Sequence, residues 1–368
     1  MYPTLEGEHV LDLRELGWDD GFAEQFAPYA AQGFVPGRVS IQHRGAYDVF
    51  TEHGEIRCDV RGRLFDEAES PADLPAVGDW VALSVHPGEQ TGTVEGLLPR
   101  RSRFSRKTAW QATEEQVIAA NVDVVFLTSS LNEDLNLRRL ERYLILGRES
   151  GAQPVVVLTK ADLHPDPDTA VRQVQELADD IPVIAISSRA GTGLATVRDY
   201  LKPGITAALL GSSGVGKSTL VNTLAGEEIL TTKEIRDDGK GRHATSHREL
   251  VRLPGGALII DTPGMRELQL WVADEGLEET FSDVTSLFAQ CRFSDCAHDQ
   301  EPGCAVKAAL ADGRLAPKRW ESYLKLEAEL AHLDRRLDKR ALSAERKRWK
   351  ALTAEGREAM RLKGRRPD

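Results

Sequence analysis

The chain has 368 residues, of which 41% are hydrophobic and 29% charged, and its formal net charge is −11. These values are typical of a globular protein with two or three domains. No apolar run approaches the length of a membrane-spanning helix, and the N-terminus lacks a secretion signal, so both classes are excluded and we expect a cytoplasmic protein.

The charge is distributed unevenly. From Asp334 to Asp368 there are 13 Lys and Arg residues against 6 Asp and Glu, so this part carries an excess of seven positive charges. A basic C-terminal tail over residues 341–368 is typical of an arm that binds nucleic acid, but a solvated charged helix has the same composition. Composition alone leaves both readings open.

The first hundred residues predict a leader and a small barrel. Residues 1–35 have an amphipathic helical pattern. Over residues 36–104 five short β-rich segments follow, which favour an OB-fold barrel (VSIQH, YDVFT, IRCDVRGRLF, DWVALSV and TGTVEGLL). The basic run from Arg100 to Lys107 then leaves the barrel, either as a rim that tracks a phosphate backbone or as a basic linker.

From residue 105 to residue 272 strands and helices alternate. Helical stretches separate four apolar runs, VDVVFLT, PVVVLT, PVIAIS and TAALLG, and RELVRLP and GALIID complete about six strands. This alternation predicts an α/β domain with a mostly parallel sheet covered on both faces. A helical domain with a cysteine cluster is expected over residues 273–340.

One glycine-rich motif lies between a buried strand and a helix. Gly211, Ser212, Ser213, Gly214, Val215, Gly216, Lys217 and Ser218 spell G-x-x-x-x-G-K-[ST]. The glycines let backbone N–H groups turn toward phosphate oxygens, and the helix N-terminus favours an anion. Lys217 can reach the β- and γ-phosphates, and the Ser218 hydroxyl can bind Mg²⁺. The motif predicts a nucleotide phosphate site.

A second phosphate motif follows about fifty residues later. Asp261, Thr262, Pro263 and Gly264 end the apolar strand LIID. In this position Asp261 binds Mg²⁺ through water, and the Gly264 N–H contacts the γ-phosphate.

The base site is encoded before the phosphate loop. Thr159, Lys160, Ala161 and Asp162 form [NT]-K-x-D directly after the strand PVVVL, and Ser187 and Ser188 end the next strand. A carboxylate here accepts both N–H donors of the guanine edge, whereas adenine has the wrong donor pattern. Alternatively, TKAD is a simple helix start capped by Asp162. Both segments together indicate a circularly permuted P-loop GTPase, because the ligand crevice of a parallel sheet is assembled from loops in any chain order.

Three of the four cysteines lie close together near the C-terminus, as Cys291-x₄-Cys296-x-His298-x₅-Cys304. Three thiolates and one imidazole predict a closed, structural zinc site, although a reduced, metal-free cluster has the same sequence. Since this segment follows Gly264 in the chain, we expect the γ-phosphate to bias the position of the zinc module.

The permuted motif order, GRHATS, DTPG, the N-terminal barrel and the Cys/His cluster together resemble the family of ribosome small-subunit-dependent GTPase A (RsgA) over nearly the whole chain. The resemblance implies an OB-fold, a permuted GTPase domain and a zinc-binding domain. It also implies GTP hydrolysis stimulated by the small ribosomal subunit and its rRNA, in late subunit maturation. We expect a monomer.

Two positions depart from the family pattern. Thr159 stands where the family usually has Asn, and it cannot make the two-sided contact of an amide. After His243 the family commonly has three threonines, but this chain has Ala244, Thr245 and Ser246. We predict Thr245 as the switch hydroxyl on Mg²⁺, with Ser246 as the second choice.

The catalytic residue has to come from outside the second phosphate motif. Many GTPases orient the attacking water with a glutamine after its glycine, but Met265 stands there. The resemblance assigns a role to His243, which we predict to position the water, although an exposed loop histidine without function is the alternative.

The predicted catalytic residues are His243, Lys217 and Thr245, and the Mg²⁺ ligands are Ser218, Thr245 and Asp261. The predicted GTP contacts are Thr159, Lys160, Asp162, Ser187, Ser188, Gly211, Ser212, Ser213, Gly214, Val215, Gly216, Lys217, Ser218, Thr219, Asp261 and Gly264.

Two other functions remain open at this stage. The chain could be an RNA-binding checkpoint module in which GTP only selects a conformation. A weaker alternative is a P-loop ATPase, which the base motif argues against.

Overall fold

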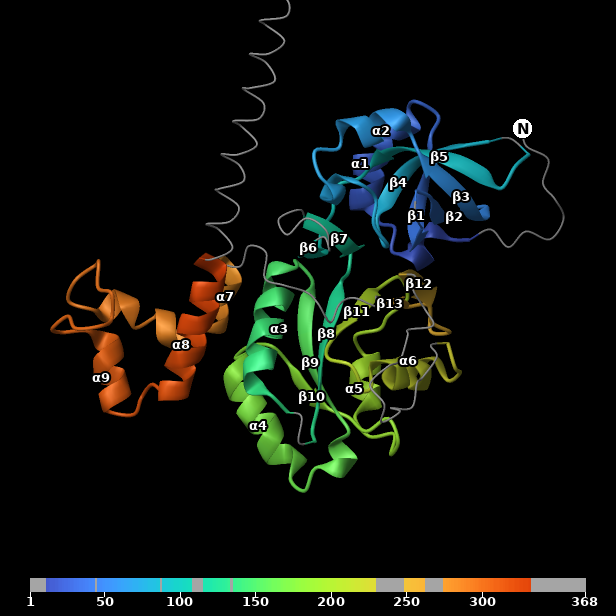
Figure 1. Ribbon diagram of the computed structural model, residues 1–368. Helices are drawn as coiled ribbons and strands as arrows, with labels where there is room; N and C mark the ends of the chain where they lie inside the picture. Colours follow the sequence, from blue (N-terminus) through green and yellow to red (C-terminus); the bar gives the residue numbers. More distant parts are fainter. Residues whose placement is uncertain are drawn as a thin grey trace, which may run out of the picture.

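The computed structural model describes residues 11–43, 45–86, 88–107, 115–132, 135–229, 248–261 and 274–331. Figure 1 shows three parts: a β-barrel with a short helical leader, an α/β part below it, and a helical module beside the α/β part. No helix among the described residues is both long and apolar enough to cross a membrane.

The barrel has the five strands that the sequence predicts. They are β1 (Val35–Gln42), β2 (Tyr47–Thr51), β3 (Gly54–Val60), β4 (Trp80–Val85) and β5 (Thr91–Leu97). The strands pair in the order β1-β2-β3-β5-β4, and β4 pairs again with β1, which closes the barrel. Its interior is filled by alternate residues such as Val39, Val49, Val81 and Val94, none of which is measurably exposed. The fold class predicted for this part, a small closed barrel, is confirmed.

The leader packs across one end of the barrel. It consists of η1 (Leu13–Leu16) and α1 (Asp20–Ala30), which begins at the capping residue Asp19. The Trp18 ring stands edge-on to the buried Trp80 of β4, with 4.7 Å between the ring centroids. Aromatic contacts of this kind account for the leader's amphipathic pattern.

One predicted strand is shorter than expected. The segment GRLF was expected to continue the third strand, but residues Gly62–Glu67 form a helix, α2. The chain leaves the barrel after β3, so these residues have no strand partner, and an Arg63–Glu67 ion pair at i,i+4 supports a helix instead.

The basic run is neither a rim nor a linker at its start. Arg100 forms an ion pair with Asp79, whose side chain is fully buried, at 2.7 Å, and Arg101 pairs with Asp19 at 2.5 Å. From Arg103 the chain forms β6 (Arg103–Lys107), which pairs with β7 (Glu115–Ala120). The first two arginines therefore hold the barrel, its leader and the loop around η2 (Pro71–Asp73) together.

All six strands predicted for the α/β part are present. They are β8 (Val124–Ser130), β9 (Gln153–Thr159), β10 (Val183–Ala185), β11 (Thr206–Leu210), β12 (Glu249–Arg252) and β13 (Leu258–Asp261). Their order is β10-β9-β8-β11-β13-β12, and only β12 is antiparallel to its neighbour in this part. β12 also pairs with β1, which joins barrel and α/β part in one sheet.

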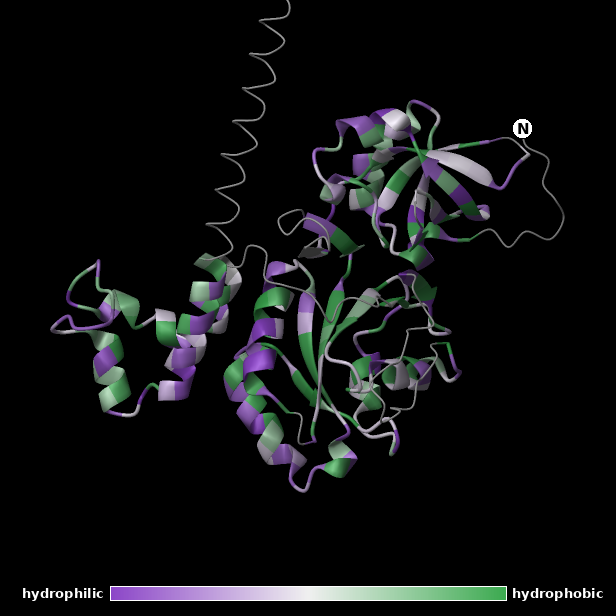
Figure 2. Cartoon of the chain, viewed as in Figure 1, coloured by the Kyte–Doolittle hydropathy of each residue, from purple (hydrophilic) through white to green (hydrophobic). Residues whose placement is uncertain are grey.

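Helices cover both faces of this sheet, which is apolar along its length (Figure 2). On one face α3 (Leu137–Glu149) and α4 (Pro167–Ala178) pack against strand residues such as Val125 and Leu127. On the other face α5 (Leu194–Arg198) and α6 (Lys217–Ala225) pack against Val124 and Phe126. Alternate residues of β8 therefore pack against the helices on opposite faces of the sheet, as in parallel sheets that are covered on both sides. The ends of five parallel strands meet at one edge, and the loops there carry the predicted motifs.

The C-terminal module is a small helical bundle. It contains α7 (Asp274–Thr280), α8 (Ser282–Thr285), η5 (Phe288–Gln290), α9 (Ala305–Ala311) and a helix over residues 317–331. Phe281, Val284 and Val306 are fully buried in its core, and Ile145 of α3 joins them. The module thus rests on α3 of the α/β part.

Candidate nucleotide site and metal centre

The phosphate loop joins β11 to α6, as the sequence predicts. Gly214 and Gly216 have φ angles of 77° and 99°, a region that side chains other than glycine rarely adopt. Gly211 is required for a different reason: a Cβ atom there would lie 2.3 Å from the carbonyl oxygen of Thr128 on β8. The loop therefore has the backbone freedom and the close packing that a phosphate cradle needs.

Lys217 is the first residue of α6. Its Nζ donates to the carbonyl oxygens of Gly211 and Ser212, both at 2.6 Å. Ser218 and Thr219 follow in the first helical turn, where the N-terminal end of the helix dipole favours an anion. The Lys217 ammonium and the N-terminus of α6, both of which favour an anion, therefore lie at the same loop.

The base motif contacts this loop directly, although it precedes it by more than fifty residues. The Thr159 hydroxyl donates to the carbonyl oxygen of Val215 at 2.5 Å, and the Lys160 Nζ donates to that of Gly214 at 2.8 Å. Lys160 has a φ of 58°, which turns the chain sharply at the end of β9. The two motifs therefore form one site at the same edge of the sheet.

The remaining residues predicted to contact the base lie beside this junction. Asp162 is exposed in η3 (Ala161–Leu163), two residues after Lys160. The Ala161 N–H donates to the Ile186 carbonyl at 3.0 Å, so the loop after β9 is joined to the segment that follows β10. Ser187 is buried there, and its hydroxyl accepts from the Ala190 N–H, while the neighbouring Ser188 is half-buried.

Several predicted residues lie outside the described part of the chain. These are His243, Thr245 and Ser246 of the polar loop, and Gly264 and Met265 after β13. Asp261 is the last residue of β13 and pairs with Glu249 of β12, which places its backbone at the same sheet edge as the phosphate loop.

Two residues that touch the phosphate loop carry no sequence signal. Arg139 Nη1 donates to the Ser212 hydroxyl at 2.8 Å, and the Tyr143 hydroxyl lies 3.3 Å from the same oxygen. Both belong to α3, which is far from Ser212 in the sequence. Their i,i+4 spacing fits any helix face, so no motif could have identified them.

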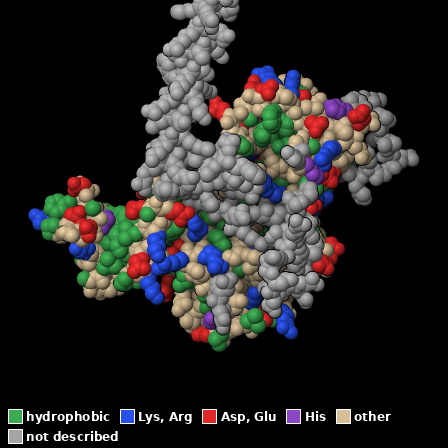
Figure 3. All heavy atoms as spheres, viewed as in Figure 1, with side chains coloured by type: hydrophobic (Ala, Val, Ile, Leu, Met, Phe, Trp, Pro, Cys, Tyr) green, Lys and Arg blue, Asp and Glu red, His purple; other side chains and the backbone are tan. Residues whose placement is uncertain are grey.

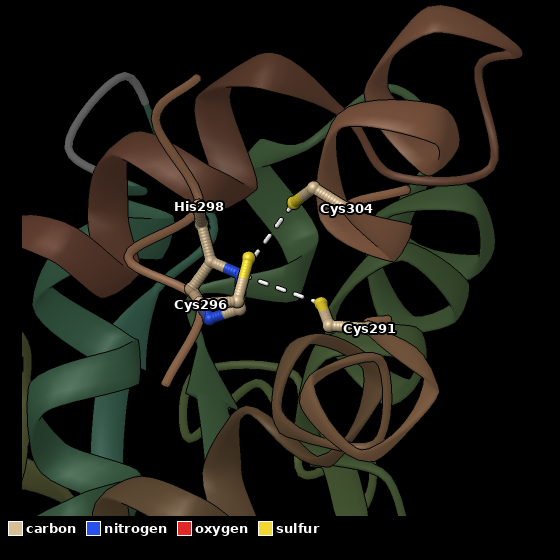
Figure 4. A group of neighbouring side chains, drawn as sticks. All are labelled: Cys291, Cys296, His298 and Cys304. Atoms are coloured by element: carbon tan, nitrogen blue, oxygen red, sulfur yellow. Dashed lines mark hydrogen bonds between the residues drawn. The ribbon is translucent and has the colours of Figure 1, made fainter. Parts of the chain in front are cut away.

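The four predicted zinc ligands converge in the C-terminal module (Figure 4). The Sγ atoms of Cys291, Cys296 and Cys304 and a ring nitrogen of His298 all lie within 4.8 Å of one another. His298 Nδ1 is 3.6 Å from the sulfur of Cys291 and 3.6 Å from that of Cys304. Tetrahedral zinc, with Zn–S of about 2.3 Å and Zn–N of about 2.0–2.1 Å, separates N and S ligands by about 3.5–3.6 Å. The cluster therefore fits zinc in both donor chemistry and spacing.

The surroundings hold the ligands in place. Backbone N–H groups donate to two of the sulfurs, from Ala305 to Cys291 at 3.4 Å and from Lys307 to Cys304 at 3.5 Å. Burial raises the pKa of the Cys291 thiol, but the Ala305 N–H and neighbouring thiols outweigh it and leave that pKa below its usual value. Such donors favour the thiolate form that binds metal.

Aromatic rings fix the histidine. The His298 ring stacks on Phe288 with 4.4 Å between centroids, and Trp320 stands edge-on to it at 5.8 Å. Trp320 belongs to the helix over residues 317–331, so the cluster ties that helix to the loop of ligands.

Comparison with known proteins identifies the family. The family model "RsgA GTPase" matches residues 97–271. "Small ribosomal subunit biogenesis GTPase RsgA" from Opitutus terrae is 49% identical over 96% of this chain and 100% of its own length. The protein of the same name from Streptomyces coelicolor is 46% identical over 99% of both chains. This chain belongs to the RsgA GTPase family.

The solved structures agree with this assignment. The crystal structure of YjeQ from Thermotoga maritima has a TM-score of 0.60 and 27% identity, and the match covers 81% of this chain and 99% of that one. YloQ, described as a circularly permuted GTPase, has a TM-score of 0.58 and 25% identity, with 81% of this chain and 96% of that one covered. The RsgA-family chain is therefore a circularly permuted P-loop GTPase that hydrolyses GTP, as predicted.

Proposed function

We propose that this GTPase binds the small ribosomal subunit and its rRNA, and hydrolyses GTP in a subunit-stimulated manner during late maturation of that subunit. The name shared by its relatives from Opitutus terrae and Streptomyces coelicolor supports this proposal. The observation that carries it within the chain is the contact between the base motif and the phosphate loop, from Lys160 Nζ to Gly214 O at 2.8 Å. This contact brings the guanine-reading and phosphate-binding segments together.

In the proposed mechanism Asp162 accepts the guanine N–H groups, with Ser187 and Ser188 beside it. Backbone N–H groups of residues 211–219 and of Gly264 hold the phosphates, and Lys217 neutralises charge that develops on the transferred group. Ser218, Thr245 and Asp261 would hold Mg²⁺, which would supply further neutralisation of phosphate charge when bound.

His243 orients the attacking water in this proposal. Met265 cannot do so, and an imidazole can accept a proton or a hydrogen bond at neutral pH. We propose that docking on the subunit brings the loop that carries His243 to the nucleotide.

The other parts would provide the contacts with the subunit. We propose domain limits of 1–35 for the leader, 36–104 for the OB-fold barrel, 105–272 for the GTPase domain, 273–340 for the zinc module and 341–368 for the basic tail. Binding as a monomer to the small subunit would place the protein in the cytoplasm. The zinc ion would be structural, because four protein ligands leave no open position for chemistry.

The test is GTP turnover measured with and without purified small ribosomal subunits, alongside the affinity for mant-GTP. A subunit-stimulated GTPase shows turnover that rises with subunit concentration, whereas a checkpoint module binds nucleotide and subunit without stimulation. Lys217→Ala should lose turnover in both conditions, and large subunits serve as the control for nonspecific RNA. Asp162→Asn should shift the preference from GTP to XTP; unchanged GTP preference would exclude the proposed base site.

A further inference from the structure

Helix α3 has three distinct faces. Successive residues of an α-helix are rotated by about 100°, so positions 139 and 143 share one face, 140, 144 and 147 a second, and 138, 142, 145 and 149 a third. The second face packs on the sheet: Leu140 and Leu144 are buried against it, and a Cβ atom on Gly147 would lie 3.1 Å from Pro154. The helix is therefore fixed to the sheet along its length.

The first face touches the phosphate loop. The Arg139 guanidinium and the Tyr143 hydroxyl both meet the Ser212 side chain, at 2.8 Å and 3.3 Å. The Ser212 carbonyl also accepts from the Lys217 ammonium, as the Gly211 carbonyl does. A displacement of this face of α3 is therefore transmitted to the residue that orients the catalytic lysine.

The third face carries the C-terminal module. Glu141, at the border of this face and 4% exposed, accepts from Arg319 at 2.8 Å, and Arg142 pairs with Glu329. Ile145 is fully buried in the core of the module. In Figure 3, basic and acidic side chains lie side by side where the module meets the α/β part. Arg319 also donates to Asp283 and to the Thr280 carbonyl, so the same side chain connects α3 with α7 and α8 of the module.

We propose that α3 couples the C-terminal module to the phosphate loop, with Arg139 and Tyr143 as positioning residues that act through Ser212. The helix is rigid and contacts the phosphate loop on one face and the C-terminal module on another. A shift of the module relative to α3 therefore moves the phosphate loop. Couplings of this type change ligand affinity by roughly five- to 150-fold. The proposal requires nucleotide binding only, and it is independent of the small subunit.

The first test is a double-mutant cycle on mant-GDP affinity. Arg139→Ala should weaken binding roughly three- to tenfold, the loss expected for a hydrogen bond from a charged group that acts indirectly. Arg139→Lys should restore most of it, because an ammonium can still donate to Ser212. In a Ser212→Ala background Arg139→Ala should have no further effect. Arg172→Ala, on the exposed face of α4, is the matched control.

Three results would overturn this part. The first is that Arg139→Ala leaves the mant-GDP affinity and the rate of hydrolysis unchanged. The second is that the losses of affinity caused by Arg139→Ala and Ser212→Ala are independent, so that the double variant shows the product of both. The third is that Arg139→Ala reduces the rate of hydrolysis at unchanged affinity. The last result would mean that the guanidinium contacts the reacting phosphate instead of positioning the loop.

The second test perturbs the module. Arg319→Gln should change mant-GDP affinity in the Ser212 protein and leave it unchanged in Ser212→Ala. Because Arg319 pairs with the buried Glu141, this variant could fail to fold, and circular dichroism would reveal that. Glu329→Gln, in a more exposed pair, then provides the same readout. Equal effects in both backgrounds, or none for either variant, would refute the coupling. Neither assay contains ribosomal subunits, so failure here is distinct from failure of the proposed function.

Discussion

The Lys160 ammonium lies 2.8 Å from the carbonyl oxygen of Gly214, and this hydrogen bond joins two motifs that are 54 residues apart. The Thr159 hydroxyl makes the neighbouring contact to Val215. Together they make the phosphate loop and the base loop one structural unit. We therefore expect a change in the predicted base loop to alter phosphate binding as well as base selectivity.

We predict that Thr159→Val weakens mant-GDP binding roughly tenfold. The substitution keeps the shape of the side chain but leaves the Val215 carbonyl without its donor, a loss of about 1–3 kcal/mol. Thr159→Asn should instead strengthen binding, because an amide can donate to the loop and also contact the base. Fluorescence titration measures both. Thr223→Val, whose hydroxyl bonds only within α6, is the control; equal affinities for all variants would contradict the prediction.

Gly211→Ala should abolish nucleotide binding. The added methyl group would lie 2.3 Å from the Thr128 carbonyl, and this backbone atom of the central sheet cannot move away easily. Gly255→Ala provides the comparison, since a Cβ atom there meets nothing within 4 Å. Isothermal titration with GDP separates the two. Normal binding by the Gly211 variant would show that the loop tolerates a shift.

His243→Ala should retain nucleotide affinity and lose subunit-stimulated turnover by about a hundredfold or more, the usual effect of removing a group that assists proton transfer. Turnover with saturating small subunits is the measurement. His86→Ala, in the exposed β4–β5 connection, controls for the loss of a surface histidine. Full stimulation in the His243 variant would remove this residue from the mechanism.

The protein should contain one zinc ion per chain, measured by atomic absorption after dialysis. Cys296→Ser should lower this value toward zero and reduce the hydrogen-exchange protection of residues 274–311, because the ligands connect η5 to α9. Cys58→Ala should keep the metal, since burial raises the pKa of its thiol to about 12 and it lies in the barrel core. A metal content that is the same in both variants would place the ion elsewhere.

Acid should weaken the attachment of the leader. The hydrogen bond from the Arg101 side chain lowers the pKa of Asp19 to about 2. A carboxylate with a depressed pKa contributes stability above its unfolded value near 3.8, and this contribution is lost as the pH falls from about 4 to 2. Asp19→Asn keeps a side chain that can cap α1 and removes the charge.

The measurement is the melting temperature from pH 5 to pH 2. The difference between the wild type and Asp19→Asn should shrink as the pH falls, by a modest amount because the pair is half-exposed. A constant difference across this range would indicate that the charge of Asp19 has no role in stability.

Much of the fold could be predicted because its signals are local. Alternating residues such as Val49 and Val94 identify barrel strands, and apolar runs ending in Thr159 or Leu210 identify buried parallel strands. The segment after Val60 departs from the prediction because Leu64 and Phe65 extend the apolar content of the strand to a place where no partner strand exists. The ion pairs of Arg100 and Arg101 could not be predicted, because their partners Asp79 and Asp19 are distant in the sequence.

The phosphate loop and the zinc ligands follow from spacing, whereas the support around them does not. Arg139 and Glu141 are ordinary helix residues until their partners Ser212 and Arg319 come close in space. The orientation of the Thr159 hydroxyl toward Val215 also depends on how β9 and β11 are spaced across β8. Such contacts depend on tertiary packing, so the sequence around these residues contains no pattern that predicts them.

The order of the strands along the chain has a consequence for synthesis. Of the strands in the α/β part, the ribosome translates β8, β9 and β10 first; β11 then pairs beside β8, and β13 pairs on the far side of β11. Lys160 consequently leaves the exit tunnel well before Gly214. A nascent chain that stops before β13 has the predicted base-reading loop but an incomplete sheet, so we expect guanine nucleotide to stabilise the fold only late in translation.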